Sequence, residues 1–236
     1  MANWITHILL AEMLLQQGIS LEKRGFCIGN IAPDCNIENA DWSAFTPARE
    51  VTHWMTGANK QTADYEGFYH QHIATRKFLS SEEAAFCWGY YCHLVTDVLY
   101  QQFIRNPVRI ASCFDRLKMA SPFSSQISGK PESFDTLKIL FGKDRVFQDI
   151  AILENNLVYD NPDCAYNQVL RKTTSFPDYL PFLPPNSITR KIPRMTYAVE
   201  KRFPEDHLLF FTKTDYQKFL SDTALSLYTL LQAKFN

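Results

Sequence analysis

The chain has 236 residues, of which 46% are hydrophobic and 14% aromatic, enough to bury one sizeable core and to exclude a disordered chain. The net charge of -1 gives no general attraction to nucleic acid or anionic membranes, so no specific nucleic-acid partner is predicted. No apolar run reaches the roughly 18 residues of a membrane span. Because the N-terminus lacks a basic segment and Glu12 interrupts its apolar stretch, we expect no signal peptide and a cytoplasmic location.

Six cysteines are present, and no two of them form a Cys-x-x-Cys pair. A structural zinc ribbon is therefore not expected. Without a secretion signal, we expect these thiols to be reduced and mostly buried as small apolar side chains.

Helical periodicity accounts for most of the chain, and we find no alternating strand pattern of any length. We therefore predict an all-α protein, a helical bundle forming a single domain over residues 1–236. The expected helices, in chain order, span residues 3–17, 61–79, 82–104, 109–119, 133–157 and 214–234.

Between the first two expected helices, the residues oppose a continuous helix. Gly29, Asn30 and Pro33 predict a tight turn over residues 26–34 that presents Asp34. Residues 35–52 are expected to form an irregular loop that leads to His53.

The helix predicted over 82–104 carries the first chemical signal. Ser80 and Glu83 fit a capping box at its start. His93 and Asp97 stand four residues apart, so their side chains lie on one helix face. Gly89 lies one turn before His93, where we expect its missing side chain to leave space beside a site.

The C-terminal half of the chain offers fewer signals. Residues 173–204 are rich in proline and aromatic residues and are expected to form a strap over the core or a lid. Thr214 and Gln217 fit a capping box for the last helix. A basic run is more typical of a hydrated helix surface than of a phosphate-binding site; its members are Arg190, Lys191, Arg194, Lys201 and Arg202.

Histidine and aspartate residues recur at element ends and on helix faces in the first hundred residues. Three imidazoles and two carboxylates suit a borderline metal such as zinc, which lowers the pKa of bound water and makes a nucleophile at neutral pH. The candidate ligands, in chain order, are His7, Asp34, His53, His93 and Asp97.

At this point the sequence resembles the family of zinc-dependent phospholipase C and single-strand nucleases, and most closely its small intracellular bacterial members. The shared features are an early Thr-His, a Gly-x-Ile-x-Pro-Asp turn, a later His, and Gly-Tyr-x-x-His-x-x-x-Asp in a core helix. Here they read Thr6-His7, Gly29 to Asp34, His53, and Gly89 to Asp97. Their order and approximate spacing agree over residues 1 to about 100.

The resemblance implies a role for each candidate ligand. His53, His93 and Asp97 would hold one metal, with Asp34 as a further ligand or as the base that orients the attacking water. His7 and Asp97 would hold a second metal, with Asp97 bridging the two.

The secreted relatives hold a third metal through two further histidines and an acid. After Asp97 the only histidine here is His207, so we expect one or two zinc ions, or another divalent transition metal. Asp144 and Asp149 are weak substitutes because i and i+5 residues do not share a helix face.

The sequence therefore predicts a metal-dependent hydrolase of phosphoric esters that acts on a small phosphoester or a phospholipid head group. The alternative is a non-catalytic metal-binding or interaction domain that retains a reduced metal site. A third class, the helical His-Asp phosphohydrolases, needs an adjacent His-Asp pair, and none occurs here. We expect His70, His72 and His207 to be surface or core residues.

Overall fold

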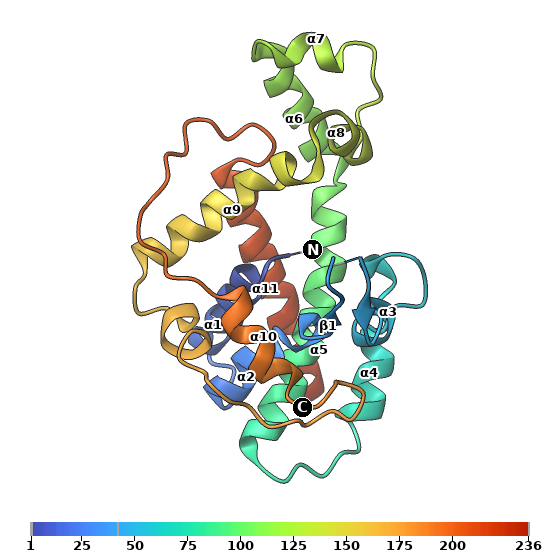
Figure 1. The fold of residues 1–236 in the computed structure, drawn as a ribbon, viewed down its shortest axis with the longest axis vertical. Helices are drawn as coiled ribbons and strands as arrows, with labels where there is room; N and C mark the ends of the chain where they lie inside the picture. The colour runs from blue at the N-terminus through green and yellow to red at the C-terminus, as the bar shows by residue number, and fades with distance from the viewer. Residues whose placement is uncertain (1, 42, 236) are drawn as a thin grey trace.

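Helix α5 (Ser81–Ile104) runs through the middle of the molecule, and the other long helices lie around it (Figure 1). The computed structural model describes residues 2–41 and 43–235. As predicted, the Ser80 hydroxyl caps α5 by accepting a hydrogen bond from the Glu83 amide at 3.0 Å. The next helix starts at Pro107, whose missing amide hydrogen suits a first helical position.

The described part of the chain is all-α apart from one antiparallel pair of short strands, which confirms the predicted fold class. None of the described helices is long and apolar enough to cross a membrane. The helices are α1 (Trp4–Gln16), α2 (Lys23–Gly29), α3 (Arg49–Thr52), α4 (Tyr65–His72), α6 (Pro107–Met119), α7 (Phe123–Ile127), α8 (Phe134–Phe141), α9 (Lys143–Asp160), α10 (Ser187–Met195) and α11 (Lys213–Phe235); short helical turns are η1 (Ala32–Asp34), η2 (Lys60–Thr62) and η3 (Tyr166–Leu170), and the strands are β1 (Ile37–Glu38) and β2 (Phe45–Thr46).

The prediction of a turn over residues 26–34 is wrong in its first half, because α2 continues to Gly29. The reason is tertiary packing. A Cβ on Gly29 would lie 2.1 Å from the Phe86 carbonyl oxygen of α5, so α2 lies directly against the α5 backbone. The packing energy of this contact outweighs the low helix propensity of glycine, on which the prediction of a turn was based. The turn itself starts at Asn30 and ends in η1, which presents Asp34.

Gly89 is the α5 residue that packs against α2 in this contact. A Cβ on Gly89 would lie 2.3 Å from the Phe26 carbonyl oxygen and 2.9 Å from the Asn30 amide nitrogen. The space that we expected Gly89 to open beside a site is therefore filled by the backbone of α2. Its small size brings the two helices together and fixes Asn30 beside α5.

The bounds of two expected helices also need correction. The helix expected over 61–79 is shorter, because Asp64 caps α4 by accepting from the Gly67 amide at 2.8 Å. The helix expected over 133–157 is split at Gly142, which has a φ of +80° that L-residues rarely adopt.

The cap of α11 also differs from the expected Thr214 and Gln217 pair. Thr212 and Asp215 cap it instead, through two reciprocal hydrogen bonds of 3.0 and 3.1 Å.

Residues 173–187 cross the N-terminal half of α5 as an extended segment held by buried aromatic contacts. Phe176 packs on Phe86 with ring centroids 5.4 Å apart. Phe182 packs on Trp54, whose centroid is 6.5 Å away, and the Arg76 guanidinium donates to the Tyr179 carbonyl at 3.0 Å. The contacts tie this segment to the core along its length.

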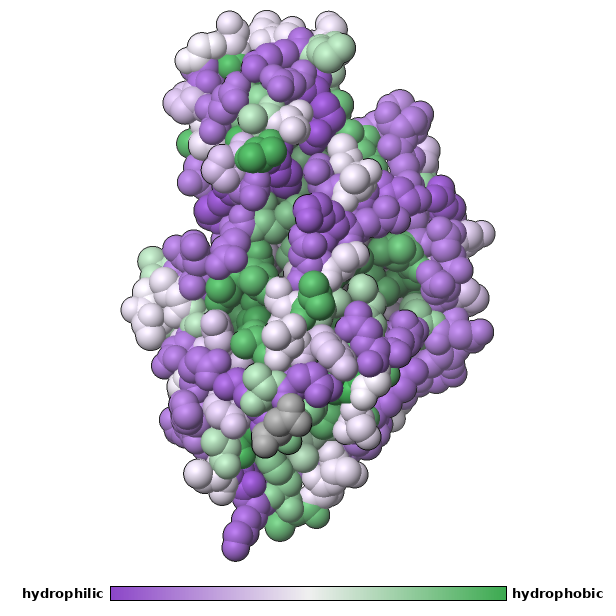
Figure 2. All heavy atoms as spheres, turned by 180° about the vertical axis from the view of Figure 1, so that it is seen from behind, coloured by the Kyte–Doolittle hydropathy of each residue, from purple (hydrophilic) through white to green (hydrophobic). Residues whose placement is uncertain are grey.

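The surface and the cysteines complete the fold. The reverse face is mostly hydrophilic, with apolar areas gathered near its middle, and the α6–α8 part projects at one end (Figure 2). All six cysteines are buried, and none of them forms a disulfide in the described structure.

The contact between α2 and α5 gives a test of the fold. We expect Gly89→Ala to lower the free energy of unfolding by about 3 kcal/mol, since the new methyl group meets backbone that has to move. The roughly 1 kcal/mol gained in helix propensity does not offset this. Urea unfolding measures the change. Gly57→Ala is the matched control, because its Cβ meets only the Thr62 side chain at 3.1 Å; an equal loss in both variants would contradict the close helix contact.

Candidate metal centre

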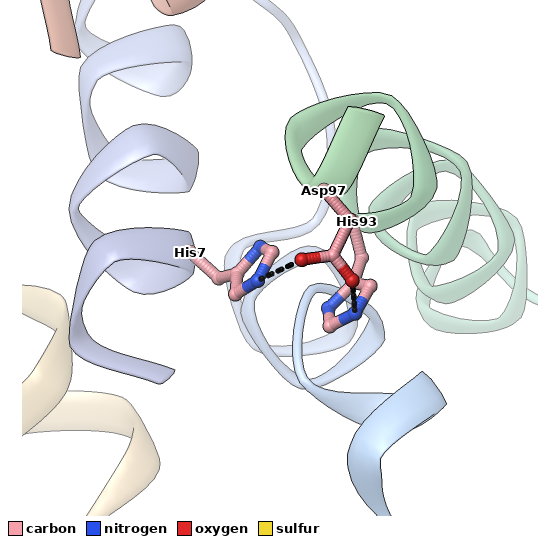
Figure 3. A group of neighbouring side chains, drawn as sticks. All are labelled: His7, His93 and Asp97. Carbon is pink, nitrogen blue, oxygen red and sulfur yellow. Dashed lines mark ion pairs between the residues drawn. The ribbon is translucent and has the colours of Figure 1, made fainter. Parts of the chain in front are cut away.

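The structure brings all five candidate ligands to one buried point. His7 comes from α1, and His93 and Asp97 come from adjacent turns of α5 (Figure 3). Asp34 ends η1, and His53 directly follows α3. We call these five residues the His–Asp cluster. Residues that are up to 90 positions apart in sequence thus share one site, as the predicted metal centre requires.

Three pairs of ligand atoms in the cluster lie at separations close to those around a zinc ion. His53 Nε2 lies 3.0 Å from Asp34 Oδ1 and 3.6 Å from Asp97 Oδ2, and His93 Nε2 lies 3.2 Å from Asp97 Oδ2. Ligand distances of about 2.0–2.2 Å around tetrahedral zinc separate the ligands by roughly 3.3–3.6 Å. These three separations are close to that range, and the described residues form two groups that could each hold a metal ion: His7, His93 and Asp97, and Asp34, His53 and His93.

The protonation of His93 shows why a cation suits this place. Its Nδ1 lies 2.8 Å from the Asn30 carbonyl oxygen, which can only accept, so Nδ1 carries the hydrogen. Nε2 lies 3.2 Å from a carboxylate oxygen of Asp97. In the neutral imidazole, the Nε2 lone pair faces this oxygen, and a shared cation would bind both groups.

His7 extends the cluster toward a second position. Its ring stacks on that of His93, with centroids 3.9 Å apart and planes inclined by 8°, and its Nε2 lies 3.9 Å from Asp97 Oδ1. His7 Nε2, His93 Nε2 and Asp97 Oδ1 are buried and have no hydrogen-bond partner among the described residues. A cation between these atoms would satisfy all three. His7 Nδ1 also lacks a partner, and a cation at Nε2 does not account for it.

Lys60, from η2, is the cluster neighbour that the sequence did not reveal. Its buried ammonium lies 2.5 Å from Asp97 Oδ2 and 3.4 Å from Asp34 Oδ1. No motif marks this lysine, because its approach depends on how η2 folds back onto α5. With all three imidazoles neutral, as metal ligands must be, the cluster and Lys60 would carry a net charge of about -1, and one divalent cation would bring it to about +1.

Burial and charge set the protonation of the cluster. Burial, with the neighbouring His93, lowers the pKa of His7 well below its usual value. Burial and the Lys60 ammonium lower the pKa of His53 to about 4. Burial opposes the ionisation of Asp34 and Asp97, yet the Lys60 ammonium and the imidazoles hold both pKa values well below the usual range. Neutral imidazoles of His7 and His53 beside ionised carboxylates match the protonation state that metal ligands require.

Other candidates lie away from the cluster. Asp149 is buried, but its Oδ2 accepts hydrogen bonds from the Leu209, Phe210 and Phe211 amides, so it holds a loop instead of replacing a metal ligand. Asp144 is exposed in the first turn of α9. Neither belongs to a metal-binding group of the described residues.

The remaining histidines and the basic run also lie outside it. His72 is buried among Trp54, Phe68 and Phe182, whereas His70 and His207 are exposed. In the basic run, Lys191 and Arg194 pair with Glu38, and Arg202 pairs with Asp160 and Glu205.

Fold and site together define a helical protein with a buried His–Asp centre suited to a divalent metal. Residues 4–100 match the protein family described as zinc dependent phospholipase C. The match confirms the resemblance seen in the sequence, and the matched segment contains the whole His–Asp cluster. Comparison with curated proteins gave no match, and comparison with solved structures gave none either.

Removing the Lys60 charge tests whether this ammonium offsets the negative charge of Asp34 and Asp97. We expect Lys60→Met to destabilise the metal-free protein by about 3 kcal/mol, because two buried carboxylates lose their counter-ion. The same change should increase the stabilisation that zinc provides, since a like charge beside the metal has gone. Thermal unfolding with a chelator and with zinc measures both effects. Lys77→Met, at an exposed lysine, is the control; an unchanged zinc effect in Lys60→Met would contradict the charge balance.

The low pKa of His53 predicts how acid affects the metal-free protein. Between pH 6.5 and about 4 the unfolded chain binds a proton at this histidine that the folded chain does not. Stability should therefore fall as the pH is lowered through this window, by on the order of 3 kcal/mol from His53. Urea unfolding of chelator-treated protein tests this. A flat profile would be inconsistent with a buried neutral His53, and His207→Ala, at an exposed histidine, should leave the profile unchanged.

Proposed function

We propose that this protein is a metal-dependent hydrolase of phosphoric esters. The observation that carries the proposal is the cluster itself, in which buried lone pairs of His7, His93 and Asp97 converge without hydrogen-bond partners among the described residues. The family match over residues 4–100 supports the same chemistry. Zinc suits the three imidazoles and two carboxylates, and the two groups of ligand atoms favour one or two ions.

Each residue of the His–Asp cluster has a role that follows from its position. His7, His53, His93 and Asp97 would hold the metal, and His93 belongs to both groups of ligand atoms. A bound divalent metal supplies Lewis acidity and activates water for attack on phosphorus. Asp34 is a further ligand, and its carboxylate, kept ionised by its low pKa, accepts a hydrogen bond from water and so orients it. Lys60 holds the carboxylates of Asp34 and Asp97 in place.

We propose a small phosphoester or a phospholipid head group as the substrate, hydrolysed in the cytoplasm. Four of the five side chains of the cluster are at most 1% exposed, whereas that of Asp34 is 11% exposed. A substrate therefore meets the cluster at one narrow opening beside Asp34, which favours a compact phosphate group over an extended surface.

A second candidate function is a non-catalytic metal-binding or interaction domain. The Lys60 ammonium favours it, because it already contacts both carboxylates and supplies part of the positive charge that they need. The two functions differ in turnover: a metal-loaded protein that hydrolyses no monoester, diester or phospholipid supports the second.

Two variants separate metal binding from chemistry. We expect His93→Ala to lose both metal and activity, since it removes the imidazole shared by the two groups of ligand atoms. Asp34→Asn should keep at least one metal and lower kcat by roughly 100-fold or more. Elemental analysis and phosphate release measure the outcomes. His70→Ala, at an exposed histidine, is the control. Full activity in His93→Ala, or in wild type dialysed against a chelator, would refute the proposal.

A further inference from the structure

Asp34 lines a cavity of about 250 Å³, which we call the Asp34 cavity. Its polar lining includes Arg49 and Lys191, and its apolar wall includes Trp4, Tyr166 and Tyr197. No other member of the His–Asp cluster lines it. Because Asp34 is also the most exposed member, a ligand that reaches the cluster through this opening occupies the Asp34 cavity.

Arg49 is tied to the cluster through its main chain and faces the cavity with its side chain. Its carbonyl oxygen lies 3.1 Å from His53 Nδ1, where it accepts the imidazole hydrogen when Nε2 faces the cluster. Its guanidinium carbon lies over the Phe45 ring, 4.0 Å from the centroid. Stacking on an aromatic face holds the guanidinium plane and leaves its N–H edge available for hydrogen bonds.

The charge of Arg49 distinguishes it from the other basic residue of the cavity. Lys191 pairs with Glu38 at 2.5 Å. Within the described residues, no carboxylate lies within ion-pair distance of Arg49. Glu154, the other acidic lining residue, accepts from Thr6 and Asn3, and both of its oxygens are thus engaged.

We propose that Arg49 binds the phosphate of the substrate, and that the substrate is a compact phosphomonoester with an apolar or aromatic group. This rests on the proposed function. A guanidinium binds phosphate oxygens in a bidentate manner, and a metal at the cluster would bind the same group from the Asp34 side. A monoester dianion offers three terminal oxygens to these two cations, whereas a diester offers two oxygens and a single charge.

The size and lining of the cavity select the rest of the substrate. Its volume is below the roughly 300–1,000 Å³ of pockets for drug-sized ligands, so only a small ester fits inside. Trp4, Tyr166 and Tyr197 provide an apolar wall for the group that leaves with the ester oxygen. The cavity is thus built for a short ester and not for a polymer.

The test uses the full-length zinc-loaded protein with Arg49→Met, Arg49→Lys and a control, Arg190→Met, at an exposed arginine of α10. The probes are p-nitrophenyl phosphate, bis(p-nitrophenyl) phosphate and inorganic phosphate. For Arg49→Met we expect a rise of roughly tenfold or more in KM for the monoester and in the Kd of inorganic phosphate. The change for the diester should be smaller, and metal content should stay the same. Arg49→Lys should lie between Arg49→Met and wild type, because it keeps the charge and loses the planar fork.

The outcomes separate this inference from the proposed function. If wild type hydrolyses neither ester but binds inorganic phosphate through Arg49, by calorimetry, the hydrolase proposal fails and the Arg49 site stands. If Arg49→Met keeps wild-type phosphate affinity and metal content, the Arg49 site is refuted while hydrolysis stands. A stronger effect on the diester than on the monoester would refute the substrate class. If Arg49→Met does not fold, Arg49→Lys with wild-type phosphate affinity in both calorimetry and KM refutes the bidentate contact.

Discussion

Buried negative charge is the constraint on which this structure depends. Asp97 is buried and Asp34 is 11% exposed, and both lie beside imidazoles in a site where an unpaired carboxylate is costly. One ammonium, from Lys60, meets part of that demand. His93 Nε2 and His7 Nε2 nevertheless face carboxylate oxygens of Asp97 and have no hydrogen-bond partner among the described residues. A divalent cation at this place would supply further positive charge.

The fold holds these side chains in place through backbone contacts. Gly29 in α2 and Gly89 in α5 allow close packing of the two helices. This packing places the Asn30 carbonyl oxygen against His93 Nδ1. The Arg49 carbonyl serves His53 in the same way from α3. Main-chain oxygens thus orient two imidazoles with their Nε2 atoms toward one point. Loss of such an outer contact typically costs roughly 10- to 100-fold in metal affinity or activity.

Local patterns in the sequence predicted the parts of the site that lie on one element. His93 and Asp97 follow from helix geometry, the Ser80 cap from its spacing to Glu83, and the all-α class from periodicity. The resemblance to a family supplied the distant ligands His7, Asp34 and His53, which no single-element pattern connects. Residues far apart in the chain were predicted only because that order of motifs was present as a whole.

The parts that sequence did not predict depend on tertiary contacts. Lys60 carries no motif, since its role arises only when η2 packs on α5. Gly29 predicts a turn when only its neighbours in sequence are considered. It lies in a helix because it packs against the backbone of α5. Asp149 is a buried carboxylate, as a metal ligand would be, but its Oδ2 accepts hydrogen bonds from three backbone amides. Each case depends on a neighbour distant in sequence, which local propensity does not register.

The most direct measurement is diffraction at the zinc absorption edge from crystals of protein purified without added metal. We expect an anomalous peak about 2.0–2.2 Å from His53 Nε2, His93 Nε2 and a carboxylate oxygen of Asp97. A second, weaker peak beside His7 would fit the bridging position of Asp97. The absence of any peak near these atoms, with the Lys60 ammonium as the only cation in contact with both carboxylates, would contradict a metal centre.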